Sequence, residues 1–239
     1  MKIIRKIAIL FFDILDNFVH QKKILLFFKK KKLNITCLID VGCHKGTYTD
    51  LFLKNFNVKK ALMFEPQKKI FTIIKKKYRK NKIIKTFNYA ISSKNKNQKM
   101  YINRHDLTSS LTKIDESNNY LKKKSRLFME NNERSLIEKI YTVKTIRLRD
   151  VLIKNRITKI ELLKIDTEGH ELEVLLGLGK FIKKTRYVLI EFHRDKIYYN
   201  YNPKKIHNYL IKNNFILEDT FKFPFTYWED RVYTNKSYK

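Results

Sequence analysis

The chain of 239 residues is poor in glycine, proline and cysteine. Five glycines and three prolines exclude a collagen-like repeat and a Gly/Pro-rich linker. The two cysteines, Cys37 and Cys43, fall in or just after one predicted strand, where a mutual disulfide is geometrically awkward. We therefore expect a protein of the reducing cytoplasm, with one main domain.

The N-terminus lacks the run of about 20 apolar residues that a membrane-spanning helix needs. It also lacks a small-residue cleavage site typical of a signal peptide. Polar residues interrupt its apolar run at helical spacing, namely Asp13, Asp16, Asn17 and His20. The pattern predicts an amphipathic helical extension over residues 1–34, followed by a domain over residues 35–239. The helix either packs across the edge of the domain, which we slightly favour, or lies peripherally on an anionic membrane at its inner face.

Acidic residues are also scarce, because 23 of them face 53 basic residues and give a formal net charge of +30. Such a charge suggests anionic partners, including nucleic acid. However, 42 of the basic residues are lysine, spread along most of the chain, whereas nucleic-acid readers favour arginine. We attribute the charge to compositional bias and expect no specific nucleic-acid partner. Apolar residues form 43% of the chain, enough for a sizeable core.

Apolar runs of strand type alternate with segments of helical spacing along most of the chain. The predicted strands are 34–42, 60–66, 83–92, 98–104, 139–146, 159–166, 186–193, 215–220 and 226–235. The predicted helices between them are 47–56, 68–80, 147–155, 170–178 and 203–214. This order indicates an α/β fold whose sheet is mixed but mostly parallel, with helices on both faces and a C-terminal antiparallel hairpin.

The most informative motif is "LIDVGCHKGTYTD", where an apolar strand runs into a glycine-containing loop and then a helix. Its glycines, Gly42 and Gly46, let the backbone turn tightly and approach a ligand at a helix N-terminus. A pyrophosphate-binding loop would need glycine at position 44, which is His44, so a nicotinamide cofactor is disfavoured. S-adenosylmethionine fits instead, with Asp40 available to its ammonium group.

A second acid, Glu65, ends the next predicted strand. A carboxylate there can accept two hydrogen bonds from a ribose diol, as an acid does at the same place in dinucleotide-binding folds. Loop, acid and strand order together predict a cofactor site. An ordinary turn between a strand and a helix is the simpler alternative.

These pieces also carry a family resemblance. "LIDVGCHKGTYTDLF", "ALMFEPQKKIF", "YAISSKN", "SSL", "LLKIDTEGHELEVLLGL" and "YVLIEFH" occur in the order seen in the FkbM family of S-adenosylmethionine-dependent methyltransferases, and the chain resembles that family over residues 35–235. The resemblance implies a class I (Rossmann-like) seven-stranded sheet and methyl transfer to a hydroxyl of a sugar, in a cell-surface glycan, glycolipid or related metabolite. The alternatives are an RNA or DNA methyltransferase and a non-catalytic basic membrane-associated protein.

The resemblance also assigns roles to particular residues. Ala90, Ile91 and Ser92 look like neighbours of the adenine, and Ser109 and Ser110 match a serine pair of the family. The full set of expected cofactor contacts is Asp40, Gly42, His44, Gly46, Tyr48, Glu65, Pro66, Ala90, Ile91, Ser92 and Asp166. His44 is expected to shape the loop rather than to react.

The stretch "IDTEGHEL" concentrates acids after a buried-type strand. A zinc site of the H-E-x-x-H kind is excluded because the second histidine is replaced by Val174. A Mg²⁺ site on two carboxylates has little support, and we expect no metal. The remaining interpretations are catalytic acid/base chemistry and capping of the next helix. The candidate catalytic residues are Asp166, Glu168, His170 and His193, whereas Glu171 is assigned to the helix N-terminus.

Overall fold

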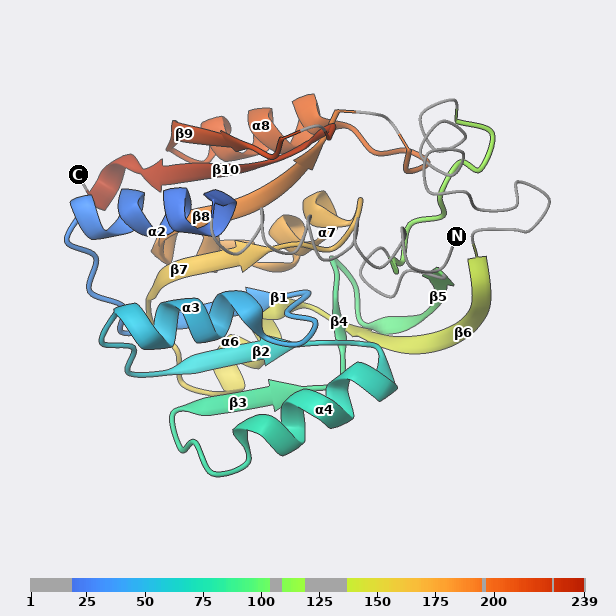
Figure 1. Ribbon diagram of the computed structural model, residues 1–239, viewed down its shortest axis with the longest axis horizontal. Coiled ribbons are helices and arrows are strands. Elements are labelled where there is room, and N and C mark those ends of the chain that lie inside the picture. The colour runs from blue at the N-terminus through green and yellow to red at the C-terminus, as the bar shows by residue number, and fades with distance from the viewer. Residues whose placement is uncertain (1–18, 104–108, 119–136, 195–196, 225, 239) are drawn as a thin grey trace.

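The computed structural model describes residues 19–103, 109–118, 137–194, 197–224 and 226–238 (Figure 1). Its centre is a seven-stranded sheet in the order β3-β2-β1-β7-β8-β10-β9. The strands are β1 (Leu38–Val41), β2 (Ala61–Phe64), β3 (Ile84–Phe87), β7 (Ile160–Ile165), β8 (Thr185–His193), β9 (Phe215–Lys222) and β10 (Trp228–Asn235). The pairs from β3 to β8 are parallel, and β10 pairs antiparallel with both β8 and β9. The predicted fold class is confirmed.

Helices cover both faces of this sheet (Figure 1). One face carries α2 (Gln21–Lys30), α3 (Thr47–Asn55) and α4 (Lys68–Tyr78). The other carries α6 (Leu148–Lys154), α7 (Glu171–Gly177), the 3-10 helix η3 (Gly179–Lys184) and α8 (Pro203–Lys212). Because both faces are covered, the parallel strands are mostly apolar on both sides, and residues of β7 are buried throughout. Both cysteines are buried and free.

A second, three-stranded sheet differs from the expectation of one strand over residues 83–92. That stretch divides into β3 and a two-residue β4 (Ala90–Ile91), which pairs with β6 (Ile137–Ile146). β6 in turn pairs antiparallel with β5 (Lys96–Asn103). The chain turns away at Asn88, whose side-chain amide donates to the backbone carbonyls of Glu65 and Pro66. The predicted adenine neighbours therefore belong to the second sheet.

The N-terminal helix α2 packs in the core. Ile24 and Phe28 are fully buried against apolar residues of the sheet and of α3, while Leu26 is exposed. In the part of the chain that the structure describes, no helix is both long and apolar enough to cross a membrane. Residues 1–18 lie outside the described residues, so the division of the chain at residue 34 stays a prediction.

The sheet face under α2 and α3 changes from apolar to charged toward the carboxyl ends of the parallel strands. Strand side chains alternate between faces, so register decides which residues meet. Asp40 of β1 pairs with Lys164 of β7, and Glu191 of β8 pairs with Asp230 of β10. The neighbouring residues on the same face, farther from this edge, are apolar. They are Leu38, Leu162, Leu189 and Val232. This edge of the sheet holds the site described below.

Candidate functional site

The loop after β1 passes very close to the end of β7. Gly42 has φ +78°, and a Cβ added there would lie 1.7 Å from the backbone oxygen of Asp166. Gly46 has φ +80° and begins α3, and a Cβ there would lie 2.4 Å from the hydroxyl of Tyr78. Both positions combine a left-handed backbone with no space for a side chain, which explains the two glycines of the motif.

Glu65, directly after β2, fixes the same loop from the other side. It is 3% exposed, and its carboxylate accepts hydrogen bonds from the backbone N–H of His44 at 3.0 Å and of Gln67 at 2.7 Å. These two hydrogen bonds fix the orientation of the Glu65 carboxylate beside the loop. Glu65 therefore presents a pre-positioned acceptor.

A cleft opens between this loop, the second sheet and the end of β7. It spans about 630 Å³, a volume that includes open solvent. The site residues expected from the sequence that line it are Gly42, His44, Glu65, Pro66, Ala90, Ile91, Asp166, Glu168 and His170. Ser109 and Ser110 line it as well.

The other expected site residues lie behind the wall of the cleft. Asp40 is buried, which raises its pKa, and accepts a hydrogen bond from Thr49 of α3 at 2.6 Å. The hydroxyl of Tyr48 donates to Asp230 at 2.9 Å. The remaining members of this group are Gly46 at the start of α3, Ser92 beside His170, and His193 beside Glu168.

The hydrogen-bond acceptor and the apolar surface of the cleft fit S-adenosylmethionine. Glu65 offers the acceptor that a ribose diol needs, and Phe64, Ala90 and Ile91 offer apolar surface to a purine ring. Gly42 lines the same cleft, where the loop after β1 packs against the backbone of Asp166. The acceptor and the apolar surface thus match the ribose and the purine of the expected cofactor.

A buried lysine sits beneath the cleft. Lys164 is 2% exposed, and its ammonium lies 2.9 Å from the carboxylate of Asp166 and 4.4 Å from the ring centre of Tyr48. Burial alone would lower the pKa of Lys164, but the charges of Asp166, Asp230 and Asp40 raise it above its usual value. Asp166 thus faces the cleft with a fixed cation behind it.

The turn between β7 and α7 is held by hydrogen bonds. The hydroxyl of Ser110 donates to the backbone oxygens of Thr167 and Glu168 at 3.2 and 2.6 Å. The carboxylate of Glu171 accepts from the backbone N–H of Thr167 at 3.1 Å and of Gly169 at 3.0 Å. Burial raises the pKa of Glu171 to about 7. Glu171 thus holds the turn at the helix N-terminus, in agreement with its structural assignment.

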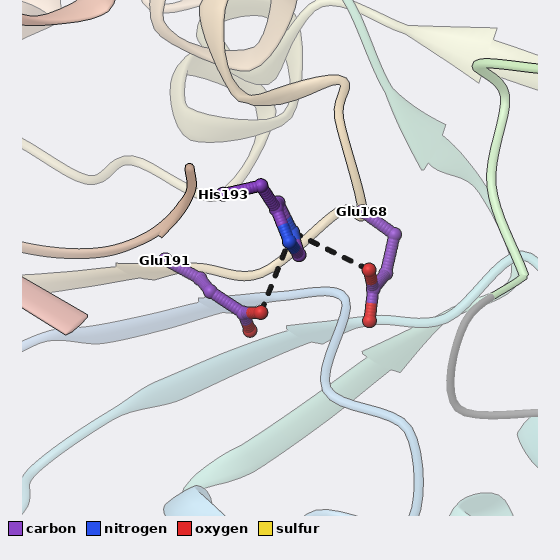
Figure 2. A group of neighbouring side chains, drawn as sticks. All are labelled: Glu168, Glu191 and His193. Carbon is purple, nitrogen blue, oxygen red and sulfur yellow. Dashed lines mark ion pairs between the residues drawn. The ribbon is translucent and has the colours of Figure 1, made fainter. Parts of the chain in front are cut away.

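The turn brings Glu168 to a cluster that the sequence alone does not reveal. One ring nitrogen of His193, Nε2, lies 3.4 Å from a carboxylate oxygen of Glu168 and 3.4 Å from one of Glu191 (Figure 2). Burial raises the pKa of Glu191 well above its usual value, and the nearby Asp166 and Glu168 raise it further. The segments "VLIEFH" and "ELLKI" do indicate such a cluster. Each places a charged residue, Glu191 or Lys164, inside a strand of the buried type, where a charge needs a partner.

His170 lies at the wall between the cleft and a second cavity. Its Nε2 is 3.0 Å from the hydroxyl of Ser92, and it is 9% exposed. Burial lowers its pKa to about 4. His170 is therefore neutral near pH 7, which suits a hydrogen-bonding role better than a charged one.

We expect the His170→Gln variant to lose less stability than the wild type when the pH falls from 6.5 to 4. A histidine with a lowered folded pKa stabilises the fold above its unfolded pKa and loses that contribution as pH falls toward its folded pKa. A shift from 6.5 to about 4 corresponds to a difference on the order of 3 kcal/mol. Urea unfolding at several pH values measures this. Parallel pH profiles for both proteins would contradict the assignment.

Comparison with known proteins places the chain among methyltransferases. The family model described as the methyltransferase FkbM domain matches residues 40–217. The hexuronic acid methyltransferase AglP of Haloferax volcanii is 36% identical over 52 residues, which is 22% of this chain and 22% of that protein. A crystal structure of methyltransferase FkbM from Methylobacillus flagellatus KT is 12% identical with a TM-score of 0.55. That likeness, which concerns the fold, covers 84% of this chain and 43% of the other.

Proposed function

Because the chain belongs to the FkbM methyltransferase family, we propose that it transfers the methyl group of S-adenosylmethionine to a hydroxyl oxygen of a sugar. One observation carries this proposal: the ribose acceptor Glu65 and the acids Asp166 and Glu168 line the same cleft. The sugar is suggested by the hexuronic acid methyltransferase named above, whose match spans about a fifth of either protein.

The cofactor would lie along the loop after β1. Glu65 would accept the ribose hydroxyls, Ala90 and Ile91 would contact the purine, and the loop at Gly42 would lie beside the amino-acid end. When bound, S-adenosylmethionine supplies an electrophilic methyl carbon on a sulfonium. The chain itself supplies the alignment, since an in-line displacement depends on where the acceptor oxygen is held.

The acceptor sugar would occupy the second cavity. This cavity spans about 850 Å³, open solvent included, and shares His170 and Leu111 with the wall of the cofactor cleft. Its other lining groups include three tyrosines and several side-chain amides, namely Tyr101, Tyr199, Tyr201, Gln98, Asn200 and Asn202. Aromatic rings offer flat apolar surface to a sugar ring, and amides offer both donors and acceptors to its hydroxyls.

Asp166 is the proton acceptor in this proposal. It lines the cleft, and its carboxylate lies 2.9 Å from the ammonium of Lys164 behind it. S-adenosylmethionine would supply the methyl group and leave as S-adenosylhomocysteine, and the carboxylate of Asp166 would accept the proton that the acceptor hydroxyl loses. Glu168 would hold the hydroxyl in line, with His193 behind it at 3.4 Å from its carboxylate, and the neutral His170 would donate or accept a hydrogen bond at the wall.

The Glu65→Gln variant should bind S-adenosylmethionine roughly 10- to 100-fold more weakly than the wild type. Hydrogen bonds to a charged group contribute about 1.5–3 kcal/mol, and glutamine keeps the shape while removing the charge. Titration calorimetry measures the affinities. A matched control is Glu161→Gln, which removes a buried carboxylate from the opposite end of β7. Equal affinities for Glu65→Gln and Glu161→Gln would contradict the role of Glu65.

The function is tested by incubating the protein with methyl-labelled S-adenosylmethionine and extracts of glycans, glycolipids and RNA. The proposal expects label in a sugar O-methyl group, identified by mass spectrometry. Label in RNA would favour the nucleic-acid alternative, and no transfer to any fraction would count against catalysis. The affinity for anionic membrane through residues 1–34 and a cytoplasmic location remain proposals, which flotation with liposomes tests separately.

A further inference from the structure

Glu168, Glu191 and His193 form a compact set of potential metal ligands. Each offers one ligand atom, and these atoms all lie within 4.8 Å of one another (Figure 2). The two measured separations from Nε2 of His193 to the carboxylates are both 3.4 Å. Ligands about 2.1 Å from a common ion lie about 3.0–3.4 Å apart along the edges of an octahedron or tetrahedron. The two separations from Nε2 of His193 therefore match the spacing of ligands around one ion, and the third pair lies within 4.8 Å.

The elements that carry these residues make the set rigid. Glu191 and His193 lie two residues apart on the same face of β8, which is central in the sheet. Glu168 belongs to the turn that Ser110 and Glu171 hold, and the hydroxyl of Tyr198 donates a hydrogen bond to its carboxylate. The backbone N–H of His193 donates to Tyr201. Outer hydrogen bonds of this kind orient metal ligands.

The charge around the set favours a cation. Glu168 and Glu191 lie beside two further carboxylates, those of Asp166 and Asp230, and Lys164 is the lysine that neighbours this group. Glu191 is 8% exposed, so water screens little of the repulsion. A divalent cation would offset two of the negative charges.

We propose that Glu168, Glu191 and His193 bind a divalent cation of the Mn²⁺ class at the edge of the cofactor cleft. Two carboxylate oxygens and one imidazole nitrogen suit this class, because Mn²⁺ accepts both ligand types. Three protein ligands leave coordination positions for water or substrate. The sequence alone predicts no metal here, because Glu168 joins Glu191 and His193 only through the pairing of β7 with β8.

The cation has a role that rests on the proposed function. Glu168 lines the cleft, so an ion on it would reach a hydroxyl held there. Coordination lowers the pKa of a hydroxyl and fixes its oxygen. Glu168 and His193 would then hold the acceptor through the ion, and Asp166 would take the released proton.

Binding of Mn²⁺ alone tests the proposal on the full chain, freed of metal and carrying no histidine tag. Electron paramagnetic resonance should show loss of the free Mn²⁺ signal, saturating at about one ion per chain, and pulsed measurements should show coupling to a nitrogen. Glu191→Gln and His193→Gln should weaken binding at least about 10-fold. The Glu161→Gln variant should bind as the wild type does.

The outcomes separate this proposal from the proposed function. An undiminished free Mn²⁺ signal with the wild type, or binding without nitrogen coupling, would overturn the metal site. Equal binding by the wild type and Glu191→Gln would do so too. The nitrogen coupling is read from the wild type, so the test stands even where a variant folds poorly. S-adenosylmethionine binding by the same metal-free samples is measured in parallel, and its absence would count against the proposed function alone.

Discussion

The Asp166→Asn variant is expected to transfer methyl groups about 10²- to 10⁴-fold more slowly than the wild type. A positioned general base contributes a factor of this size, and asparagine keeps the shape of aspartate without accepting a proton. The effect should fall on kcat rather than on cofactor affinity, because Glu65 and the glycine loop are unchanged. Single-turnover kinetics with labelled S-adenosylmethionine and the identified sugar acceptor would measure it.

The matched control for Asp166→Asn is Asp50→Asn. Asp50 lies in α3, accepts a hydrogen bond from Tyr78 and does not line the cleft. Asp50→Asn should therefore keep the wild-type rate of transfer. Wild-type kcat in Asp166→Asn would remove Asp166 from the chemistry and direct attention to Glu168 or His193.

Replacing Lys164 with methionine should lower the free energy of unfolding by about 3–5 kcal/mol. Lys164 is fully enclosed, and its ammonium faces Asp166, Asp40, Asp230 and Glu191. Removing one partner of a buried ion pair leaves an uncompensated buried charge, which costs this much in other proteins. Urea denaturation near pH 7 would measure the loss.

An exposed lysine supplies the comparison for Lys164→Met. Lys22 lies on the outer side of α2, and Lys22→Met should change the free energy of unfolding by less than about 0.5 kcal/mol. A Lys164→Met variant as stable as the wild type would mean that protonation of the surrounding carboxylates, and not the charge of Lys164, neutralises them.

The fold was predictable because the apolar pattern of each segment agrees with the strand or helix that the segment forms. The alternation of strand and helix patterns, the covered parallel strands and the final hairpin all follow from apolar periodicity. The exception is the stretch after β3, where the side-chain amide of Asn88 bonds two backbone carbonyls and the chain enters a second sheet. That bond joins residues distant along the chain, so no local pattern predicts it.

The residues of the candidate site were predictable where they directly follow the carboxyl end of a parallel strand. Gly42, Glu65 and Asp166 follow β1, β2 and β7, and all three line the cleft. Asp40 also sits near a strand end, but strand alternation turns it toward α3, where it bonds Thr49. Its expected contact with the cofactor stays a prediction.

The charged cluster could not be predicted, because it depends on register. Asp230 meets Glu191 only through the antiparallel pairing of β10 with β8. His20 meets Asp230 at 2.9 Å across 210 positions of the chain. A sequence shows that Lys164 and Glu191 interrupt apolar strands, but the order of the strands decides which charges they meet.

A crystal structure with S-adenosylhomocysteine bound would test the central claim most directly. The ribose hydroxyls should lie within hydrogen-bonding distance of the Glu65 carboxylate. The amino-acid end should lie at the loop containing Gly42, with the sulfur facing Asp166 and Glu168. A ligand bound elsewhere, or bound in this cleft with its ribose away from Glu65, would contradict the account.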